Sequence, residues 1–382
     1  MGTAMSADPK SAYSPGLEGV IAGESTICWV DPNAGLLYRG YDVHELAANA
    51  SFEVVVWLLL HDDLPTPEQL GQISQQLADE RTLPKPVLSA LELMPRDTHP
   101  MDMLRTGVSM LAAFDPELND HSHDANVRKA VRLIAKVSTL ITSGWRIAHG
   151  EEPVPAQHDL THAANFVYKL AGNVPESWQT EVFDTILVLY AEHEFNASTF
   201  SARVTASTMA DMYAAVTTAL GTLKGPLHGG ANEEAMKVLV EIGSPERADA
   251  WLKDKLARKE KVMGFGHRVY KKGDSRVPMM RDICRKLGQR FNQPQWVAIC
   301  EKLEEVMERE KHLCANLDLY AAPVFHLMGV APALNTPIFA ASRVSGWCAH
   351  VIEQHDHNRL IRPRCLYTGP ERRAYRPTRA AA

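Results

Sequence analysis

The 382 residues of this chain are enough to form two domains and a sizeable hydrophobic core. A hydrophobic fraction of 45%, a charged fraction of 23% and a formal net charge of -6 are typical of a soluble globular protein and argue against a nucleic-acid-binding surface. The longest plainly apolar run, residues 54–60, is too short to span a bilayer, and the chain opens without the charged-then-apolar leader of a secreted protein.

The first predicted element is a small β-hairpin near the N-terminus. Two short extended stretches, residues 25–30 and 36–38, flank the sequence DPNAG at residues 31–35. Proline, asparagine and glycine in this order favour a tight turn. We therefore expect the two stretches to pair as antiparallel strands.

Helical patterns dominate the rest of the chain. Thr66 followed by Pro67 and Glu68 has the cap and first-turn proline of a helix start. Residues 207–224 carry apolar side chains on one helix face, which the Gly-Pro pair at residues 225–226 ends. That face consists of Met209, Met212, Val216, Leu220 and Leu223.

A second apolar stripe lies opposite a charged face in residues 296–308, as expected of a surface helix. The stripe consists of Trp296, Ile299, Cys300, Leu303 and Met307. Strands do not alternate with helices along the chain, so a doubly wound sheet is disfavoured. We predict a mainly α fold with one small N-terminal β-hairpin.

Three segments far apart in the chain each place an ionisable residue on a Gly- or Asn-rich bend. They carry His228 in residues 225–232, His267 in residues 264–270 and Asp318 in residues 316–318. Glycine beside a histidine permits a tight turn and the close approach of a ligand. Two histidines and a carboxylate suffice to move protons on and off carbon and oxygen. The alternative for His228 and Asp318, taken singly, is that each caps a neighbouring helix.

The bend at His267 has a basic rim. Two glycines precede the histidine, but the full GxGxxG spacing and a preceding buried strand are missing, which argues against a dinucleotide loop. The rim suits a ligand that carries phosphate groups. A solvated basic loop is an alternative explanation of the lysines, but it explains the sequence GFGH at residues 264–267 poorly. The basic residues are Lys261, Arg268, Lys271 and Lys272.

Two further features of the charged residues bear on function: the surroundings of Asp318, and three arginines that could bind carboxylates. Asp318 has apolar neighbours, which should desolvate its carboxylate and raise its affinity for a proton. Arg276, Arg343 and Arg362 carry guanidinium groups, which bind carboxylates in bidentate fashion. If these arginines converge, they would suit a dicarboxylate; each taken singly is better explained by an ordinary surface ion pair.

The six cysteines lack the CxxC spacing of a zinc or redox site. In a chain of this size they predict reduced thiols, mostly buried, and a cytoplasmic location. They are Cys28, Cys284, Cys300, Cys314, Cys348 and Cys365.

The chain resembles the citrate synthase family over nearly its whole length. The motifs that carry this resemblance are long and ordered. They are GVIAG at residues 19–23, YRGY at 38–41, HPMD at 99–102, AEHEFNAST at 191–199, the His228 and His267 loops, NLD at 316–318 and NRLIRP at 358–363.

The resemblance implies the condensation of an acyl-CoA with oxaloacetate, followed by hydrolysis of the thioester. Asp318 would remove a proton from the acyl carbon, His228 would donate a hydrogen bond to the thioester oxygen, and His267 would protonate the oxaloacetate carbonyl. The acyl-CoA is a substrate, so no cofactor and no metal are expected.

The resemblance also implies the binding residues and the domains. The oxaloacetate ligands would be His193, Arg276, Arg343 and, from the other subunit of a homodimer, Arg362. The coenzyme A loop would consist of Lys261, Val262, Met263, Gly264 and Phe265. Residues 1–228 and 329–382 would form a large helical domain, and residues 229–328 a smaller mobile one.

Three alternatives to a citrate synthase remain at this point. The nearest is 2-methylcitrate synthase, which uses propionyl-CoA, because a pocket distinguishes one methylene by only ~1–3 kcal/mol. A metal-dependent hydrolase is suggested by His350, His355 and His357, although a spacing of five residues is poorer than four for one helix face. The pair His121 and His123 adds to that suggestion. A non-enzymatic helical scaffold is the third.

Overall fold

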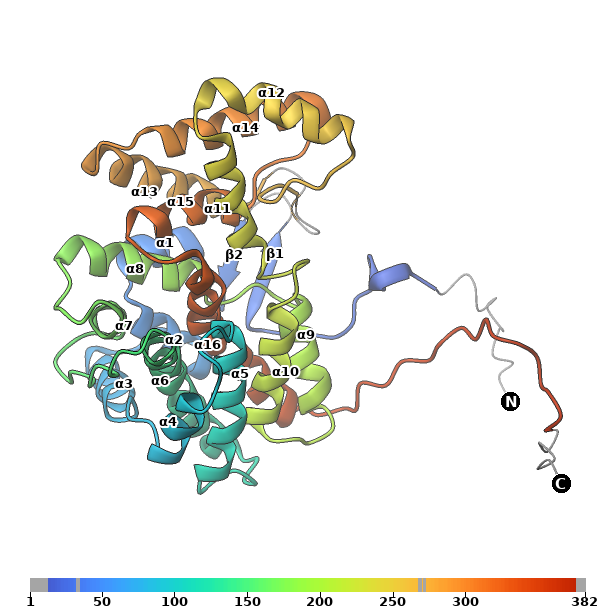
Figure 1. Ribbon diagram of the computed structural model, residues 1–382. Helices are drawn as coiled ribbons and strands as arrows, with labels where there is room; N and C mark the ends of the chain where they lie inside the picture. Colours follow the sequence, from blue (N-terminus) through green and yellow to red (C-terminus); the bar gives the residue numbers. More distant parts are fainter. Residues whose placement is uncertain (1–12, 32–34, 267–269, 271–272, 376–382) are drawn as a thin grey trace, which may run out of the picture. The chain divides into compact units, whose positions relative to one another are not determined.

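A computed structural model describes residues 13–31, 35–266, 270 and 273–375. In this part of the chain there are sixteen α-helices and one small sheet, so the predicted mainly α fold is confirmed (Figure 1). The strands are β1 (Cys28–Asp31), β2 (Gly35–Tyr38) and β3 (Tyr41–Asp42). The α-helices are α1 (Val43–Asn49), α2 (Phe52–His61), α3 (Pro67–Asp79), α4 (Lys85–Glu92), α5 (Pro100–Leu111), α6 (His123–Ala148), α7 (His162–Ala171), α8 (Ser177–Tyr190), α9 (Ala197–Ala206), α10 (Met212–Leu223), α11 (Ala231–Ile242), α12 (Pro245–Ala257), α13 (Val277–Arg290), α14 (Gln295–Lys311), α15 (Leu317–Leu327) and α16 (Asn335–Asp356). Short 3-10 helices are η1 (Pro15–Leu17), η2 (Ala112–Phe114) and η3 (Pro332–Leu334).

The chain divides into two compact units. One comprises Ser25–Leu360 and contains the sheet and all sixteen α-helices of the described residues. The other joins the two ends of the chain, Met1–Glu24 and Ile361–Ala382, and its described part has η1 as its regular element. The site described below is built within Ser25–Leu360.

The predicted hairpin is present, and a third strand extends it. β1 and β2 pair antiparallel, with Cys28 opposite Tyr38, while the turn residues 32–34 lie outside the described part. β2 continues into β3 through Arg39 and Gly40, both of which have positive φ. Positive φ at two central residues is the geometry of the tight hairpin turn that matches strand twist. The third strand was not predicted because its two residues are too few to show alternation.

Helix capping explains where two of the predicted helices begin. Thr66 Oγ1 accepts a hydrogen bond from Gln69 N, and the Gln69 side chain accepts one from Thr66 N, which forms a capping box at the predicted start of α3. α10 begins at Met212 because Asp211 caps it. The prediction that Met209 belongs to its apolar face is wrong, since Met209 has a φ of 63° and is exposed.

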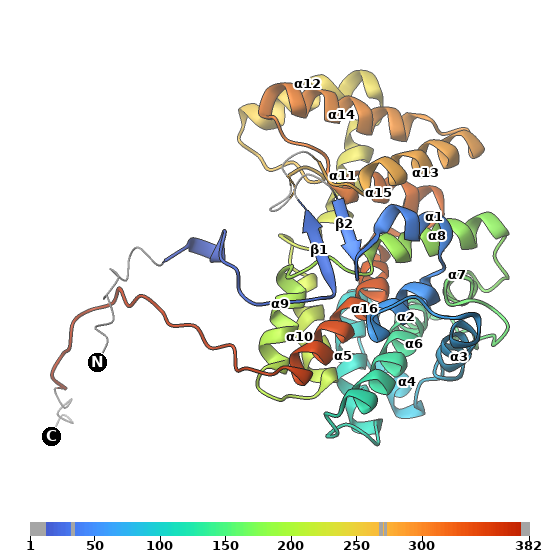
Figure 2. The ribbon, with the colours of Figure 1, turned by 180° about the vertical axis from the view of Figure 1, so that it is seen from behind.

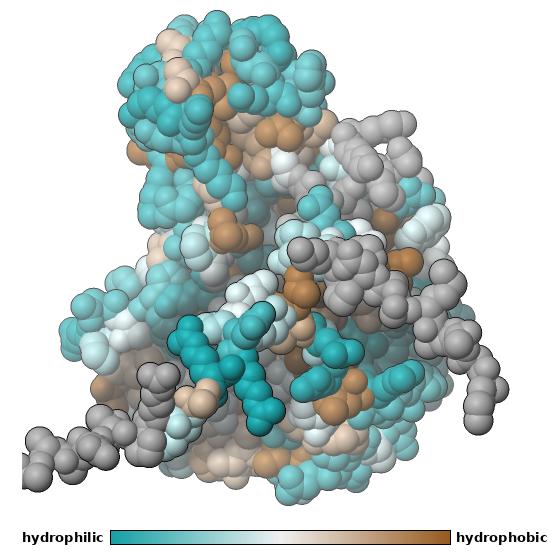
Figure 3. All heavy atoms as spheres, turned by 90° about the vertical axis from the view of Figure 1, so that its right-hand side faces the viewer, coloured by the Kyte–Doolittle hydropathy of each residue, from teal (hydrophilic) through white to brown (hydrophobic). Residues whose placement is uncertain are grey.

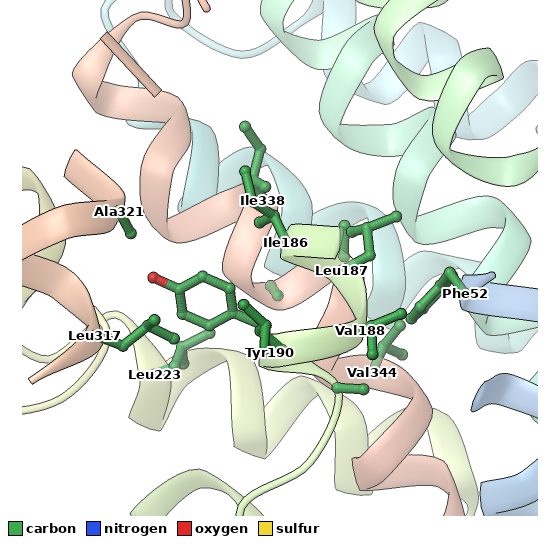
Figure 4. Packing of buried hydrophobic residues seen from close by; sticks show 14 of the residues in the cluster. Phe52, Ile186, Leu187, Val188, Tyr190, Leu223, Leu317, Ala321, Ile338 and Val344 are labelled. Carbon is green, nitrogen blue, oxygen red and sulfur yellow. The ribbon is translucent and has the colours of Figure 1, made fainter. Parts of the chain in front are cut away.

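The core of the larger unit surrounds α16. This helix packs on α6, α9, α10, α8 and α2, and nearly all of its residues are buried. A helix that is buried on most sides is rarely polar, yet α16 carries the buried polar residues Arg343 and His350. Figure 4 shows the apolar part of this packing. The labelled residues include Ile338 and Val344 of α16, Ile186, Leu187 and Val188 of α8, and Phe52 of α2.

Helices α11–α15 pack largely on one another. α13 and α11 both contact α15, and α12 contacts α14. Figures 1 and 2 show the five helices together at one end of the unit, with α2–α7 at the other. The buried stripe predicted for residues 296–308 lies on α14 and faces this group, with Ile299, Cys300, Leu303 and Met307 buried. The group falls within residues 229–328, where the resemblance predicts a separate mobile domain.

Figure 3 shows one face of the protein, on which hydrophilic residues predominate and hydrophobic ones are interspersed. Among the described residues, no helix combines the length and the apolar character needed to cross a membrane. All six cysteines are free thiols, and Cys28, Cys284, Cys300 and Cys348 are buried.

Candidate active site

The C-terminal end of α8 gathers residues from three other parts of the chain. The last carbonyl oxygens of a helix have no intrahelical donors and form the negative end of its dipole. Arg276 Nη1 donates to Leu189 O at 3.3 Å, and Arg343 Nε donates to Tyr190 O at 2.7 Å. The Tyr38 hydroxyl from β2 also lies 3.3 Å from Leu189 O. Two of the three predicted arginines therefore meet at one helix end.

Arg276 is held in place by a buried carboxylate. Its Nε and Nη2 donate to the two oxygens of Asp274 at 2.9 and 2.8 Å, and both side chains are almost fully buried. Burial opposes the charge on Arg276, but Asp274 keeps its pKa above the ordinary value. Asp274 Oδ2 also accepts a hydrogen bond from Leu317 N at 3.2 Å. One carboxylate thus joins Arg276 to the first turn of α15.

Arg343 is a buried cation whose charge the protein leaves largely uncompensated. The residue is 1% exposed, and its guanidinium lies 4.7 Å from the centre of the Phe339 ring. Burial lowers its pKa, and Glu192 opposes that effect without forming an ion pair with it. Among the described residues, Arg343 has the Tyr190 carbonyl as its hydrogen-bond acceptor and no carboxylate partner. Because an unpaired buried charge is costly, this arrangement is typical of an anion-binding site.

Asp318 stands in the first turn of α15 with one oxygen occupied. Asn316 caps the helix by accepting from Asp318 N at 3.1 Å. Asp318 Oδ1 accepts hydrogen bonds from Asn232 Nδ2 at 3.0 Å and from the Tyr190 hydroxyl at 3.3 Å. Figure 4 shows the Tyr190 ring projecting toward Leu317. Oδ2 accepts no hydrogen bond from a described residue, so it is available to a ligand or a proton.

Burial raises the pKa of Asp318, as its apolar neighbours led us to expect. Asn232, Arg276 and Tyr190 act in the opposite direction, because each stabilises the ionised form. The charge of Arg276 reaches the Asp318 carboxylate in this way, although the two side chains do not form an ion pair. The result is a carboxylate with an increased proton affinity, which is the property of a general base.

His228 lies on the bend that follows α10. Its Nε2 is 2.8 Å from Ser198 Oγ, and its ring stands edge-on to Phe339 at 6.3 Å. Burial, and then the charge of Arg343, lowers the pKa of His228 to about 4. The ring is therefore neutral at neutral pH and carries a single N–H. A neutral imidazole of this kind polarises a carbonyl group without transferring a full charge to it.

His193 follows α8 on a bend that is also fixed by polar contacts. The residue is 6% exposed, and its ring stands edge-on to Tyr270 at 5.5 Å. Asn196 Nδ2 donates to His193 O at 3.3 Å. Glu194 has a φ of 54°, which is uncommon for a residue with a side chain.

The predicted coenzyme A loop runs beside the segment that carries Asp318. Asn316 N donates to Gly264 O at 3.0 Å, and Gly266 N donates to Cys314 O at 2.9 Å. Gly264 has a φ of 90°, and a Cβ there would lie 3.1 Å from Leu319. Of the other predicted loop residues, Lys261 is exposed, Val262 is buried, and Met263 and Phe265 are half-buried. Backbone pairing therefore holds this loop against the start of α15.

Two predicted site residues are not placed with the others. His267, together with Arg268, Lys271 and Lys272 of the basic rim, lies outside the described residues. Arg362 is an exposed residue of the unit formed by the two chain ends, which is described by itself.

Several residues of the site were not predicted from the sequence. Asp274 lies two residues before Arg276, and this spacing of opposite charges was a usable signal. Asn232 and Ser198 stand inside the quoted motifs without having been singled out. Tyr190 gave no signal, because it ends an apolar helix face like any core residue.

Two of the histidines that suggested a metal site, His350 and His355, bind separate protein partners. His350 contacts Glu192 and Arg203, whereas His355 contacts Asn126 and the Ala210 carbonyl. In the described part of the chain, no three His, Cys, Asp or Glu side chains are arranged to hold a metal ion.

Comparison with known proteins gives concordant results. A family model described as "Citrate synthase, C-terminal domain" matches residues 16–364. The chain is 45% identical over 363 residues to Citrate synthase 2 of Bacillus subtilis (strain 168), covering 95% of this chain and 97% of that protein. It is 46% identical over 365 residues to Citrate/2-methylcitrate synthase of the same organism, covering 95% and 98%. A solved ternary complex of carboxymethyl coenzyme A and oxaloacetate with citrate synthase from Thermoplasma acidophilum is similar with a TM-score of 0.89 and 33% identity, covering 96% and 98%.

Proposed function

Because the chain belongs to the citrate synthase family of acyltransferases, we propose that it condenses acetyl-CoA with oxaloacetate and water to give citrate and CoA. The observation that carries this proposal is Arg343, a buried guanidinium without a carboxylate partner among the described residues, next to Arg276 at the end of α8. Two guanidinium groups are suited to a dicarboxylate. The ligands named for the Thermoplasma complex support the same pair of substrates.

The first step is removal of a proton from the methyl group of acetyl-CoA. Asp318 takes this proton on its open Oδ2, since Oδ1 is held by Asn232 and Tyr190. The thioester oxygen gains negative charge as the proton leaves, and the neutral His228 ring donates a hydrogen bond to it. A donor placed in advance for such an oxygen contributes several kcal/mol, about 2.7–4 kcal/mol where it has been measured. A carboxylate alone is too weak a base for this carbon acid.

The second step joins the enol carbon to the carbonyl carbon of oxaloacetate. Arg276, Arg343 and His193 bind the two carboxylates, and His267 gives a proton to the carbonyl oxygen as it becomes a hydroxyl. Water then hydrolyses the thioester of citryl-CoA, which releases CoA. Each of these steps uses side chains of the protein, so the proposal includes no cofactor.

We extend the proposal to the assembly and its motion. Residues 229–328 close over the site as a mobile domain, which excludes water until condensation is complete. The protein acts as a homodimer in which Arg362 of one subunit binds oxaloacetate in the site of the other. Its free cysteines support a reducing, cytoplasmic setting.

The choice of acyl group is tested by a thiol-release assay with oxaloacetate and either acetyl-CoA or propionyl-CoA. We expect kcat/KM to be higher for acetyl-CoA, by about 5- to 150-fold, the value of one methylene. A preference for propionyl-CoA would support the alternative, 2-methylcitrate synthase, which the name of one Bacillus relative makes a specific candidate. Absence of thiol release with both substrates would refute the activity itself.

The pH dependence of the rate should report the ionisation of Asp318. The base works only as the carboxylate, so kcat/KM should fall about tenfold per pH unit below its pKa. Tyr190→Phe removes a hydrogen bond that lowers this pKa, and it should therefore move the acidic limb of the profile to higher pH while the alkaline plateau changes little. Tyr213→Phe, at a buried tyrosine bonded to Asp115 instead, is the control. A shift to lower pH in Tyr190→Phe would contradict the assignment.

A further inference from the structure

The bend at residues 191–196 is held from behind by a buried chain of polar side chains. Glu192 Oε1 lies 3.0 Å from His350 Nε2, and both side chains are fully buried. His350 Nδ1 lies 2.9 Å from Arg203 Nη1, and Arg203 Nη1 also contacts Glu353 Oε2 at 2.6 Å. The chain therefore runs from Glu192 on the bend, through α16 and α9, to Glu353.

The donors and acceptors along this chain are fixed by chemistry. A guanidinium group only donates hydrogen bonds, so His350 Nδ1 accepts from Arg203. His350 Nε2 then carries the ring proton, and this N–H donates a hydrogen bond to the Glu192 carboxylate. A single imidazole thus connects a buried anion to a buried cation and leaves both of its nitrogens satisfied. Rotation of the His350 ring would break both of these hydrogen bonds, which fixes its orientation between Glu192 and Arg203.

The bend also packs tightly against the same face of α16. A Cβ at Gly346 would collide with Glu192 Oε2 and would lie 2.5 Å from Ala191 O. Phe195 stands edge-on to the His350 ring at 5.7 Å, and the Arg203 guanidinium lies 4.8 Å from the Phe195 ring centre. Residues on both sides of His193 are therefore anchored to His350 and Arg203.

Two oxaloacetate ligands of the proposed function depend on this anchoring. His193 directly follows Glu192, and Arg343 donates to Tyr190 O at the other end of the same segment. Glu194 is held at positive φ, an unfavourable conformation for a residue with a side chain, which persists only where surrounding contacts impose it. Glu192 in addition places a negative charge near Arg343 without occupying its Nη atoms.

We propose that Glu192, His350 and Arg203 are positioning residues for oxaloacetate: they hold the bend against α16 so that His193 and Arg343 keep the spacing that the substrate requires. None of the three touches the substrate. The inference rests on the proposed function, because it takes oxaloacetate as the ligand of His193 and Arg343.

The test compares His350→Phe with His355→Phe in the full chain. Phenylalanine preserves the ring but removes both hydrogen bonds. His355 is a buried histidine of the same helix, bonded to Asn126 and the Ala210 carbonyl, and it makes a matched control. His350→Phe should raise the KM for oxaloacetate about tenfold or more, and the KM for acetyl-CoA by less than about twofold. Both variants should lower the melting temperature, but His355→Phe should leave both KM values unchanged.

Further variants keep the proposal open to refutation. His350→Gln retains a donor and an acceptor, and it should restore the KM for oxaloacetate to within about threefold of wild type. If His350→Phe does not fold, His350→Asn replaces it, because the shorter amide can still contact Arg203 but does not reach Glu192. We expect it to raise the KM for oxaloacetate about threefold or more. A lower or unchanged KM for oxaloacetate in a folded His350→Asn, or an equal rise in both KM values in a folded His350→Phe, overturns the inference.

Failure of the inference is distinguishable from failure of the proposed function. A wild-type protein that releases no thiol refutes the activity. A wild-type protein that is active, with positioning variants that bind oxaloacetate normally, refutes the positioning role alone. Oxaloacetate-induced shifts of the melting temperature provide a second readout that needs no turnover.

Discussion

Asp318→Asn is expected to lower kcat by about 10²–10⁴-fold, the contribution typical of a general base. Asparagine has nearly the same shape, and its amide oxygen can still accept from Asn232 and Tyr190. What it lacks is a basic oxygen at the position of Oδ2. The KM for oxaloacetate should change little, because Asp318 is not one of its ligands. Steady-state thiol release with acetyl-CoA measures both parameters.

The same substitution should preserve or raise stability. Burial raises the pKa of Asp318, so the folded protein binds this proton more tightly than the unfolded chain does. Above the unfolded pKa the ionised carboxylate therefore costs stability, and a neutral amide removes that cost. Asp184→Asn is the control, since burial raises the pKa of Asp184 to about 7 and the residue lies outside the site. Thermal unfolding at neutral pH should show no loss in either variant, and only Asp318→Asn should lose activity. Near-normal kcat in Asp318→Asn would refute its role as the base.

The start of α3 and the first β-hairpin could be predicted from the sequence, because each is determined by residues that are close together in the chain. Thr66 and Pro67 sufficed for the start of α3, and turn residues sufficed for the first hairpin. The error at Met209 has the same origin. Its apolar side chain fits the helical period, but the cap at Asp211 and the positive φ of Met209 decide where α10 begins. Periodicity alone does not contain that information.

Short sequence patterns do not show which distant residues come together in the site. Nothing in the separate patterns around Arg276 and Arg343 shows that both donate to the last carbonyls of α8. Their meeting depends on how α16 and the segment before α13 reach the end of α8 in three dimensions. Only the resemblance to a family predicted it. Tyr190 and the Glu192–His350–Arg203 chain were missed for the same reason. Their functional contacts span 128 to 158 positions in sequence.

Arg343→Met is expected to weaken oxaloacetate binding by about 30- to 4,000-fold in KM, which corresponds to ~2–5 kcal/mol for one partner of a buried charge pair. The Nη atoms of Arg343 have no acceptor among the described residues, so binding of a carboxylate does not have to break an existing ion pair. Nearly all of the lost interaction should therefore appear as lost affinity. Arg343→Lys should recover little of it, because an ammonium group lacks the planar fork of guanidinium.

Stability should change in the opposite direction from binding. In the absence of substrate, the buried charge of Arg343 is opposed by desolvation, and methionine fills similar space without that cost. Arg343→Met should therefore melt at or above the temperature of the wild type. Arg81→Met is the matched control, because Arg81 is equally buried but donates to the carbonyls of Gln157 and Leu160. We expect Arg81→Met to lose stability and to keep its KM for oxaloacetate. If Arg343→Met instead unfolds and Arg81→Met loses oxaloacetate affinity, Arg343 is a structural residue and the dicarboxylate lies elsewhere.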